Sequence, residues 1–501
     1  MDQFYGIEID EFPAKIARTA LYLIDHLANR EVSAEFGQHL VRFPIPAAPH
    51  IEQANALRID WNGVVPASAC DFVFGNPPFG GHVTRSRSQT EDLQDVWGDG
   101  YAKWLDHVTG WYRKALDYGQ GHSTRFAFVS TNSISQGEQV ARLWRPLFGA
   151  GYTIRFAHQT FAWTSEARGT AHVHVVIVGF SHGPLTAQRR LFTYARPQAD
   201  AIEVAARNIS PYLVEGPDVT VAGRSTPLSA SMPPIHYGSL PSDGGALIVT
   251  ADEYPHGDPV AQKYLRRYVG SNELLNGIQR WCLWMPDGPA PRDAQRSSFI
   301  RGRLLAVTES RLASRNPDTR DLADQPYRFF HNAQPTTAYL GIPAQVSQTR
   351  RWYTVELLGP DVIASNALYT GEDPDGFLFG LLSSAMLITW LRGIGGALKS
   401  DLRYSKSIVH NTFPLPAGFP AAKRHAVISA GRAVRQVRKR YTGATLAELY
   451  DPLATPAELI AAHDRLDKAV DALFDDRRRK WAELARLSHL IERYATAIET
   501  T

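Results

Sequence analysis

The stretch DFVFGNPPF, Asp71–Phe79, ends an apolar run abruptly in an asparagine, two prolines and an aromatic ring. Such a run is typical of a buried parallel strand that leads into a rigid loop. Pro77 and Pro78 have a fixed φ and no N–H, so their carbonyls stay free as acceptors, and Asn76 adds an amide oxygen. Two convergent acceptors beside the flat ring of Phe79 suit a planar substrate that carries an exocyclic amino group. A plain turn at the end of a strand is the alternative, because Asn-Pro pairs are common in loops.

Strands and helices alternate on both sides of this stretch. We expect strands over Gln3–Ile9, Ala54–Ile59, Phe72–Phe74, Arg125–Ser130, Tyr152–Phe161 and His172–Phe180. Apolar residues at three- and four-residue steps predict helices over Ala14–Asn29, Trp104–Tyr118 and Gln136–Phe148. This alternation predicts an α/β fold with a doubly wound, Rossmann-like parallel sheet in residues 1–183.

Polar residues stand where the first three expected strands end. Glu8, Asp10, Asp60 and Asn76 would therefore share the carboxyl edge of the sheet, where such folds bind their ligands. A carboxylate at a strand end can accept from both hydroxyls of a ribose, and a second can accept from an adenine amino group. Helix capping uses the same residues just as often. Together with the Asn-Pro-Pro-Phe loop, the pattern favours a nucleoside cofactor beside an amino-group acceptor site.

The composition sets limits on location and partners. The net charge of +3 is too small to name a partner, but only ten of the 53 basic residues are lysine. Arginine suits phosphate and base-edge recognition, although a GC-rich genome produces the same bias. The two cysteines form no metal-ligand pattern and indicate a reducing compartment, and no secretory signal is visible. The most apolar segment, Phe377–Leu391, is too short to span a membrane, so we expect a cytoplasmic protein.

The remainder of the chain changes character twice. Residues 184–245 are rich in proline and glycine and are expected to form a connector. Residues 246–420 interleave arginines with aromatic residues, which is typical of a nucleic-acid surface, with a solvated face over ordinary core aromatics as the alternative. The prominent members are Trp281, Trp284, Phe299, Arg301, Arg303, Arg311, Arg315, Arg320, Arg350, Arg351, Trp352 and Tyr353. The pattern of residues 421–501 predicts helices, and the first of these helices is basic over Lys423–Arg440.

The chain resembles the gamma-class adenine-N6 DNA methyltransferases, most closely the methyltransferase and target-recognition portion of type IIL restriction–modification polypeptides. The resemblance spans nearly the whole chain, through YGIEIDEFPAKIA (5–17), NALRIDW (55–61), GNPPFGG (75–81), FAWTSEARGTAHVHVVIVGF (161–180), YLGIP (339–343) and RYSKSIVHNTFPLP (403–416). Asn-Pro-Pro-aromatic alone also occurs in RNA and protein-glutamine methyltransferases. The ordered set, followed by a recognition-type region, is much more specific.

The resemblance implies how S-adenosyl-L-methionine (SAM) would be held. Glu8 would bind the ribose hydroxyls, Ile9 would lie against the adenine ring, and Asp10 belongs to the same cofactor site. Asp60 would accept from the amino group of the cofactor adenine.

The resemblance also assigns the residues that handle DNA. Asn76 and the Pro77 carbonyl would accept both hydrogens of the target adenine N6, while Phe79 and Phe161 would stack on the flipped base. Trp163 is the second choice for the role of Phe161. In the recognition domain, Gln348, Arg350 and Arg351 are predicted base contacts, because glutamine suits adenine and arginine prefers guanine.

Two parts of the family pattern are missing. No lysine has Asp or Glu two residues before it, so we expect no DNA cleavage by this chain. The family's glycine-rich cofactor loop and the strand before it precede the Glu8 strand, yet only seven residues stand before Glu8, without Gly-x-Gly. The interpretation is either a truncated product or a partner polypeptide, encoded upstream, that supplies this strand and loop. Truncation is favoured, because Met1 lies within what looks like continuous family sequence.

The leading hypothesis is thus a site-specific adenine-N6 methyltransferase for double-stranded DNA, dependent on its missing part. A DNA-recognition subunit that binds without catalysing is the alternative. Methylation of RNA or of a protein glutamine is a third reading, and the large arginine- and aromatic-rich region argues against it.

Overall fold

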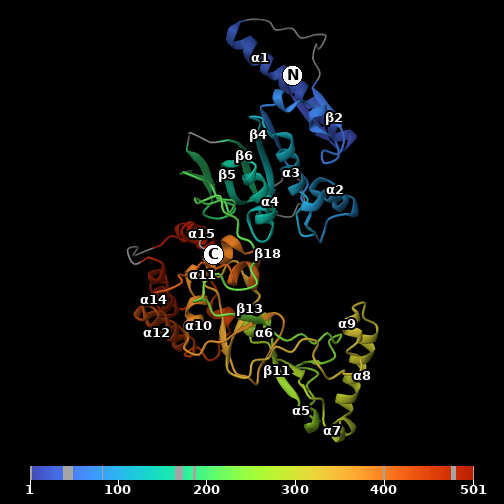
Figure 1. Ribbon diagram of the computed structural model, residues 1–501, viewed down its shortest axis with the longest axis vertical. Helices are drawn as coiled ribbons and strands as arrows, with labels where there is room; N and C mark the ends of the chain where they lie inside the picture. Colours follow the sequence, from blue (N-terminus) through green and yellow to red (C-terminus); the bar gives the residue numbers. More distant parts are fainter. Residues whose placement is uncertain are drawn as a thin grey trace. The chain divides into compact units, whose positions relative to one another are not determined.

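The computed structural model describes residues 3–37, 49–81, 83–163, 173–183, 188–398, 401–475 and 481–499. The chain forms two compact units, Met1–Thr220 and Val221–Thr501 (Figure 1). In the described residues, no helix is long and apolar enough to cross a membrane. The apolar segment noted in the sequence forms two short, buried helices, α10 (Phe377–Leu382) and α11 (Ala385–Ile394).

The first unit is built on a six-stranded sheet flanked by α2 (Arg87–Trp97), α3 (Thr109–Tyr118) and α4 (Gln139–Gly149). The strand order is β3 (Phe72–Gly75), β4 (Arg125–Thr131), β6 (Val173–His182), β5 (Tyr152–Trp163), β7 (Arg189–Thr193) and β8 (Ile202–Ala206). The pairs β3–β4 and β5–β7 are parallel, and β4–β6, β5–β6 and β7–β8 are antiparallel. The predicted α/β, Rossmann-like class is confirmed, with antiparallel pairing that the sequence pattern did not predict.

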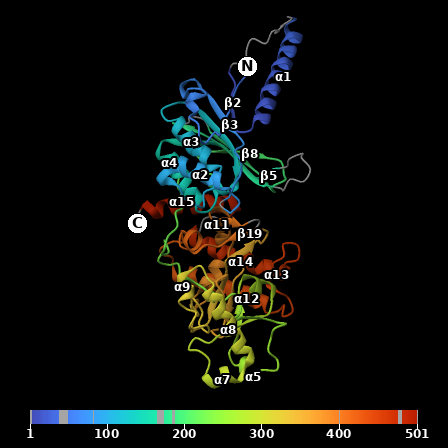
Figure 2. The same ribbon diagram turned by 90° about the vertical axis from the view of Figure 1, so that its right-hand side faces the viewer.

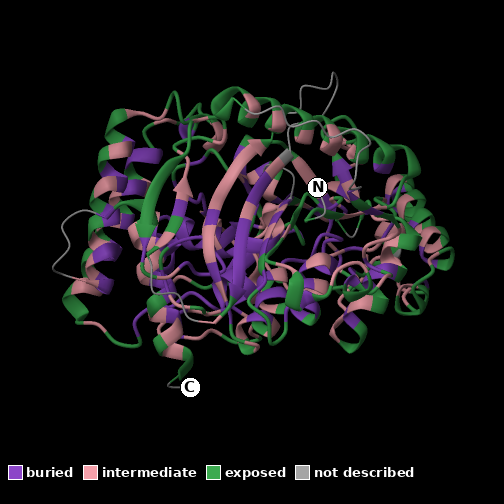
Figure 3. Cartoon of the chain, turned by 90° about the horizontal axis from the view of Figure 1, so that it is seen from above, coloured by how far each residue is buried: buried purple, intermediate pink, exposed green. Residues whose placement is uncertain are grey.

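The core of this unit follows the period-two burial of β4. Phe126 and Phe128 are buried, and the ring of Phe180 on β6 contacts both of them and Tyr112 of α3. Phe180 stacks on Tyr112 with ring centroids 5.3 Å apart. In Figure 3 the buried residues run along the strands at the centre of the view. This packing fixes β3 and β4, and therefore the loop after β3, on a rigid base.

A separate parallel pair, β1 (Tyr5–Glu8) and β2 (His50–Gln53), lies at the start of the chain with α1 (Glu11–Phe36). The expected strand Ala54–Ile59 was wrong: the strand ends at Gln53 and a turn follows. The Asn55 side chain accepts from Leu57 N, and its backbone carbonyl accepts from Arg58 N. Such local bonding by asparagine competes with a strand ladder, which explains the shift.

Within the described chain, β1–β2 and β3 share no backbone pairing, and β3 pairs only with β4. Apolar side chains near these open edges face solvent: Phe74 on β3 is 77% exposed, and Phe12 on α1 is 73% exposed. Ala14 is the single buried residue among the described residues of α1. Figure 2 shows α1 extending away from the six-stranded sheet. The two sheets therefore present strand edges and apolar surface that lack a partner in the described chain.

The expected connector, residues 184–245, does not form a separate segment. Its described part contributes β7 and β8 to the first sheet, and β9 (Ile235–Tyr237) to a sheet of the second unit. The strands are short and set among prolines and glycines, so their two-residue period is too brief to recognise.

In its described residues, the second unit contains three small sheets with helices between and after their strands. Their strand orders are β10-β12-β11-β16, β15-β13-β17-β9 and β14-β19-β18. The strands besides β9 are β10 (Ile248–Thr250), β11 (Leu265–Val269), β12 (Arg280–Leu283), β13 (Tyr339–Pro343), β14 (Gln345–Ser347), β15 (Glu356–Leu358), β16 (Ile363–Ala364), β17 (Leu368–Gly371), β18 (Ala397–Leu398) and β19 (Asp401–Arg403). Its remaining helices are α5 (Pro259–Gln262), α6 (Ser271–Asn276), α7 (Pro291–Arg296), α8 (Ser298–Leu312), α9 (Pro317–Arg320), α12 (Ala421–Arg438), α13 (Leu446–Leu449), α14 (Ala457–Phe474) and α15 (Glu483–Glu499).

A buried histidine gives this unit a pH-dependent stability. His410 Nε2 donates to the Pro233 carbonyl at 2.7 Å, which leaves Nδ1 to accept from the Tyr404 hydroxyl at 2.8 Å. Burial lowers the pKa of His410 to about 4. Because the folded pKa lies below the unfolded value, the contribution of the neutral ring is complete above about pH 6.5 and is lost as the pH falls towards 4. We expect His410→Gln to remove up to about 3 kcal/mol of this pH-dependent difference.

The measurement is urea unfolding of the full chain and of His410→Gln at pH 5 and pH 7. The wild type should lose more stability than the variant on acidification. An identical loss in both proteins would contradict the assignment.

Candidate active site

The loop after β3 carries the predicted acceptors. Asn76 is exposed directly beyond the strand, Pro77 is buried, and Phe79 is half-buried. The register places Gly75 opposite Phe128, so the loop begins beside the middle of β4, whose residues Phe128 and Ser130 are buried. The strand and the loop therefore lie where the sequence predicts them, with the Asn76 side chain accessible to a ligand.

Glu8 is the last residue of β1, and Asp10 directly precedes α1. Glu8 Oε1 accepts from the Asp10 backbone N–H at 3.1 Å, and Ile9 between them is 59% exposed. The Asp10 side chain makes no capping bond to α1. Both carboxylates thus remain available to donors from a ligand, with an apolar side chain beside them.

Asp60 lies in a turn seven residues beyond β2 and not at the end of a strand. Its Oδ1 accepts from Asn62 N at 3.0 Å and caps the short 3-10 helix Trp61–Gly63. Helix capping, the alternative role for this carboxylate, therefore accounts for one of its two oxygens. Oδ2 makes no hydrogen bond to any described residue.

Lys114 of α3 supports the segment that carries Asp60. Its ammonium donates to the Ile59 carbonyl at 2.6 Å. Burial lowers the pKa of Lys114, while the nearby Asp60 carboxylate acts in the opposite direction. The contact holds the end of the turn against α3.

Phe161 lies near the end of β5, next to an irregularity in the β5–β6 pairing between His158 and Phe161. Its ring stacks on Tyr194 with centroids 5.2 Å apart, and Trp163 lies 6.2 Å from it. Bulges of this kind re-aim side chains at strand ends. Tyr194, directly after β7, is an aromatic partner that the sequence did not reveal, because β7 was not predicted.

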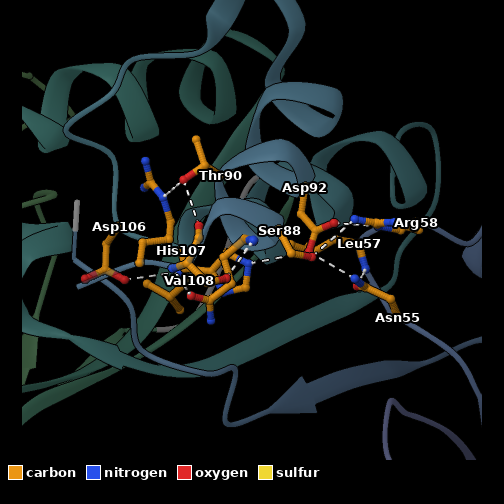
Figure 4. A network of polar contacts seen from close by, with 12 residues as sticks. Asn55, Leu57, Arg58, Ser88, Thr90, Asp92, Asp106, His107 and Val108 are labelled. Atoms are coloured by element: carbon orange, nitrogen blue, oxygen red, sulfur yellow. Dashed lines mark hydrogen bonds and ion pairs between the residues drawn. The ribbon is translucent and has the colours of Figure 1, made fainter. Parts of the chain in front are cut away.

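A polar network that the sequence analysis also missed joins the segment before Asp60 to the loop after Asn76 (Figure 4). Its centre is formed by Asp92 of α2 with Asp106 and His107, which precede α3. Asp92 binds Asn55 and Arg58, and Asp106 binds the backbone of the Asn76 loop at Gly80. In the sequence these residues give no stronger signal than ordinary helix-flanking polar residues.

The predicted base contacts differ in exposure. Gln348 is exposed in the turn after β14, and Arg351 is exposed, pairs with Asp464 at 2.6 Å and lies over the ring of Trp352. Arg350 is only 8% exposed and donates to the Leu446 carbonyl. This burial argues against the base contact expected for Arg350, since a duplex cannot reach it without displacing the fold.

Other members of the arginine and aromatic set are also buried or bind backbone in the interior. Trp352 and Tyr353 are buried, and Arg311 is fully buried. Arg303 donates to the carbonyls of Ala246 and Ile248. The alternative interpretation, a solvated face over ordinary core aromatics, was also incomplete. It did not include arginines that bind buried backbone carbonyls. In the described ranges, no cluster of three His, Cys, Asp or Glu could hold a metal ion.

Three family models match consecutive parts of the chain. Residues 1–193 match the MmeI DNA-methyltransferase domain, 215–417 the MmeI target recognition domain and 419–500 the MmeI C-terminal domain. The three matches follow one another in order and together cover nearly the whole chain, and this establishes its family. This chain belongs to the MmeI family.

A solved structure and a curated relative are similar to this chain over its whole length. The type IIL restriction-modification enzyme MmeI, solved in complex with DNA, is 42% identical over 99% of this chain, with a TM-score of 0.86. DNA methyltransferase A of Bacillus subtilis (strain 168) is 34% identical over 507 residues, which include the whole of this chain. The chain spans 56% of the length of that curated relative and 66% of the solved MmeI chain.

Proposed function

We propose that the chain is the methyltransferase and target-recognition part of a restriction–modification enzyme that methylates adenine N6 in double-stranded DNA in the cytoplasm. The observation that carries the proposal is the exposed Asn76 amide on a proline-fixed loop. The carboxylates of Glu8 and Asp60, each with an oxygen left for a ligand, support it. The MmeI-type recognition domain supplies the surface for the duplex, with Gln348 and Arg351 as proposed base contacts.

In this proposal the Asn76 side-chain oxygen and the Pro77 carbonyl accept the two N6 hydrogens of the flipped adenine. The nitrogen lone pair then points away from both acceptors, towards the methyl donor. As the new N–C bond forms and the methyl–sulfur bond of SAM breaks, positive charge develops on nitrogen, and the two oxygens stabilise it. The surplus N6 proton leaves to solvent. Phe79 and Phe161 stack on the base and offset part of the cost of unstacking it from the duplex.

The described residues fit the adenosine half of SAM. Glu8 Oε2 and Asp60 Oδ2 are acceptors suited to ribose hydroxyls and to an adenine amino group, and Ile9 offers an apolar contact. Asp10 stands beside Glu8 with its carboxylate free of a helix cap. When bound, SAM supplies the electrophilic methyl group.

The open strand edges suggest the missing component. The backbone groups on the unpaired sides of β1 and β3 need partners, and a parallel strand between them would satisfy both edges. The exposed apolar side chains Phe72 and Phe74 would be covered by the same element. We therefore include in the proposal a polypeptide segment that adds this strand and a glycine-rich loop.

The experiment measures methyl transfer from labelled SAM to genomic duplex DNA, with N6-methyladenine identified by mass spectrometry. The chain is assayed alone and after co-expression with the polypeptide encoded immediately upstream. We expect transfer only in the co-expressed sample. Transfer by the chain alone would remove the requirement for an added strand.

Failure of both samples to transfer, with specific duplex binding retained, would establish the second function, a DNA-recognition subunit without catalysis. The open edge of β3 beside the acceptor loop is the observation that favours it. Label that enters RNA or protein glutamine, and not DNA, would contradict the adenine assignment.

A further inference from the structure

Gly80, directly after the Asn-Pro-Pro-Phe loop, is held on both sides by consecutive residues. Its N–H donates to Asp106 Oδ1 at 3.1 Å, and its carbonyl accepts from His107 N at 2.9 Å. A Cβ at Gly80 would come within 3.2 Å of the His107 Cβ, so the close approach favours glycine. The end of the target loop therefore has little freedom to move away from Asp106 and His107.

The Asp106 carboxylate is itself fixed by the sheet and by the start of α3. It is 4% exposed and also accepts from the Thr131 hydroxyl at 3.0 Å. It accepts in addition from Val108 N at 3.3 Å (Figure 4). Its backbone N–H donates to the Gln139 side chain at 2.8 Å. A buried carboxylate with its donors in place is a rigid anchor, because losing one of them would leave charge unsatisfied.

A second buried carboxylate holds the segment on the cofactor side. Asp92, 3% exposed, accepts from Asn55 Nδ2 at 3.0 Å and from Arg58 Nε at 2.6 Å. Arg58 lies two residues before Asp60, so Asp92 sets where that acceptor stands. The His107 Nε2 lies 4.0 Å from Asp92 Oδ2, so the residue after Asp106 lies next to the second carboxylate.

Helix capping and core packing explain part of this arrangement, since Val108 N belongs to the start of α3. They do not explain why one carboxylate also binds Gly80 of the target loop, or why its neighbour binds both polar side chains that precede Asp60. We propose that Asp106 and Asp92 are positioning residues for methyl transfer, Asp106 acting on the Asn76 loop through Gly80 and Asp92 acting on the Asn55–Asp60 segment. This rests on the proposed function.

The two anchors should have different kinetic signatures. Displacing the target loop by about 1 Å misaligns the amine and the methyl group and can cost on the order of 100-fold in rate. Displacing the Asn55–Asp60 segment weakens adenosine binding before chemistry begins. Loss of Asp106 should thus lower kcat, and loss of Asp92 should raise the KM for SAM.

The experiment uses the sample that transfers methyl groups in the assay above and compares Asp106→Ala, Asp106→Asn and Asp92→Ala. We expect Asp106→Ala to lower kcat by about 100-fold with the KM for SAM changed by less than about threefold. Asp106→Asn keeps an oxygen that can accept from Gly80 N–H, so it should return kcat to within about tenfold of the wild type. Asp92→Ala should raise the KM for SAM by at least about tenfold.

Glu91→Gln, on the exposed side of α2, is the matched control and should behave as the wild type. Unchanged kcat in Asp106→Ala, a loss carried by KM in that variant, or no recovery in Asp106→Asn would overturn the role of Asp106. An unchanged KM in Asp92→Ala would overturn that of Asp92. Absence of transfer by the wild type would instead overturn the proposed function, and the inference with it.

Discussion

Replacement of Asn76 by alanine should abolish methyl transfer and leave the affinity for duplex DNA largely intact. The change removes one of the two acceptors for the N6 hydrogens, so the amine loses both its alignment and an oxygen that stabilises the developing charge. Losing one such preorganised polar group typically costs on the order of 100- to 1,000-fold in rate. Asn76 stands on an exposed loop after β3, so its truncation leaves the core unchanged.

The measurement pairs a single-turnover transfer assay with a DNA-binding titration on the same preparations. Asn276→Ala, at the exposed end of α6, is a control of the same residue type. Retained transfer in Asn76→Ala would remove Asn76 from its proposed role. Loss of transfer together with loss of DNA binding would assign it to recognition and not to catalysis.

Replacement of Arg311 by alanine should give the largest loss of stability in the second unit. This guanidinium is fully buried on α8 and donates to the carbonyls of five residues, namely Pro241, Ser242, Leu322, Gln325 and Arg328. Burial lowers its pKa, and no carboxylate binds it within the described chain. Truncation leaves five carbonyls without their donor and opens a cavity, so we expect a loss of about 3–5 kcal/mol.

Urea unfolding followed by tryptophan fluorescence measures this loss, because Trp281 and Trp284 pack against the same core as α8. Arg311→Lys should be intermediate, since an ammonium keeps the charge without the planar fork. Arg315→Ala, at an exposed position four residues on, should stay within about 0.5 kcal/mol of the wild type. A loss below about 1 kcal/mol in Arg311→Ala would show that the carbonyls find other donors.

The residue type of Arg311 did not predict its place in the structure. In the sequence it belongs to an arginine- and aromatic-rich set typical of a nucleic-acid surface, and so does Arg350. Both are buried, and both donate to backbone carbonyls far away in the chain. Composition cannot separate an arginine that meets phosphate from one that meets backbone, because each offers the guanidinium the same kind of acceptor.

Local patterns predicted what depends on neighbours in the sequence. The apolar run before Asn76, closed by two prolines, predicted both β3 and the rigid loop, since chain stiffness and strand burial are properties of a few adjacent residues. The strand predicted over Ala54–Ile59 was wrong, because the Asn55 side chain binds the backbone of Leu57 and turns the chain there. β7 and β8 escaped prediction because strands of five residues leave too weak a period.

The sequence by itself determined the α/β class and the strand and loop around Asn76, and it predicted, from residue type, the carboxylates for a nucleoside. Only the tertiary structure decided that Asp106 and His107 hold the end of that loop at Gly80, and that Asp92 of α2 holds the Asn55–Asp60 segment. Within the described residues, it also decided that β1 and β3 keep open edges, since pairing depends on which strands lie side by side. Contacts between distant segments follow from packing in three dimensions, which no local pattern encodes.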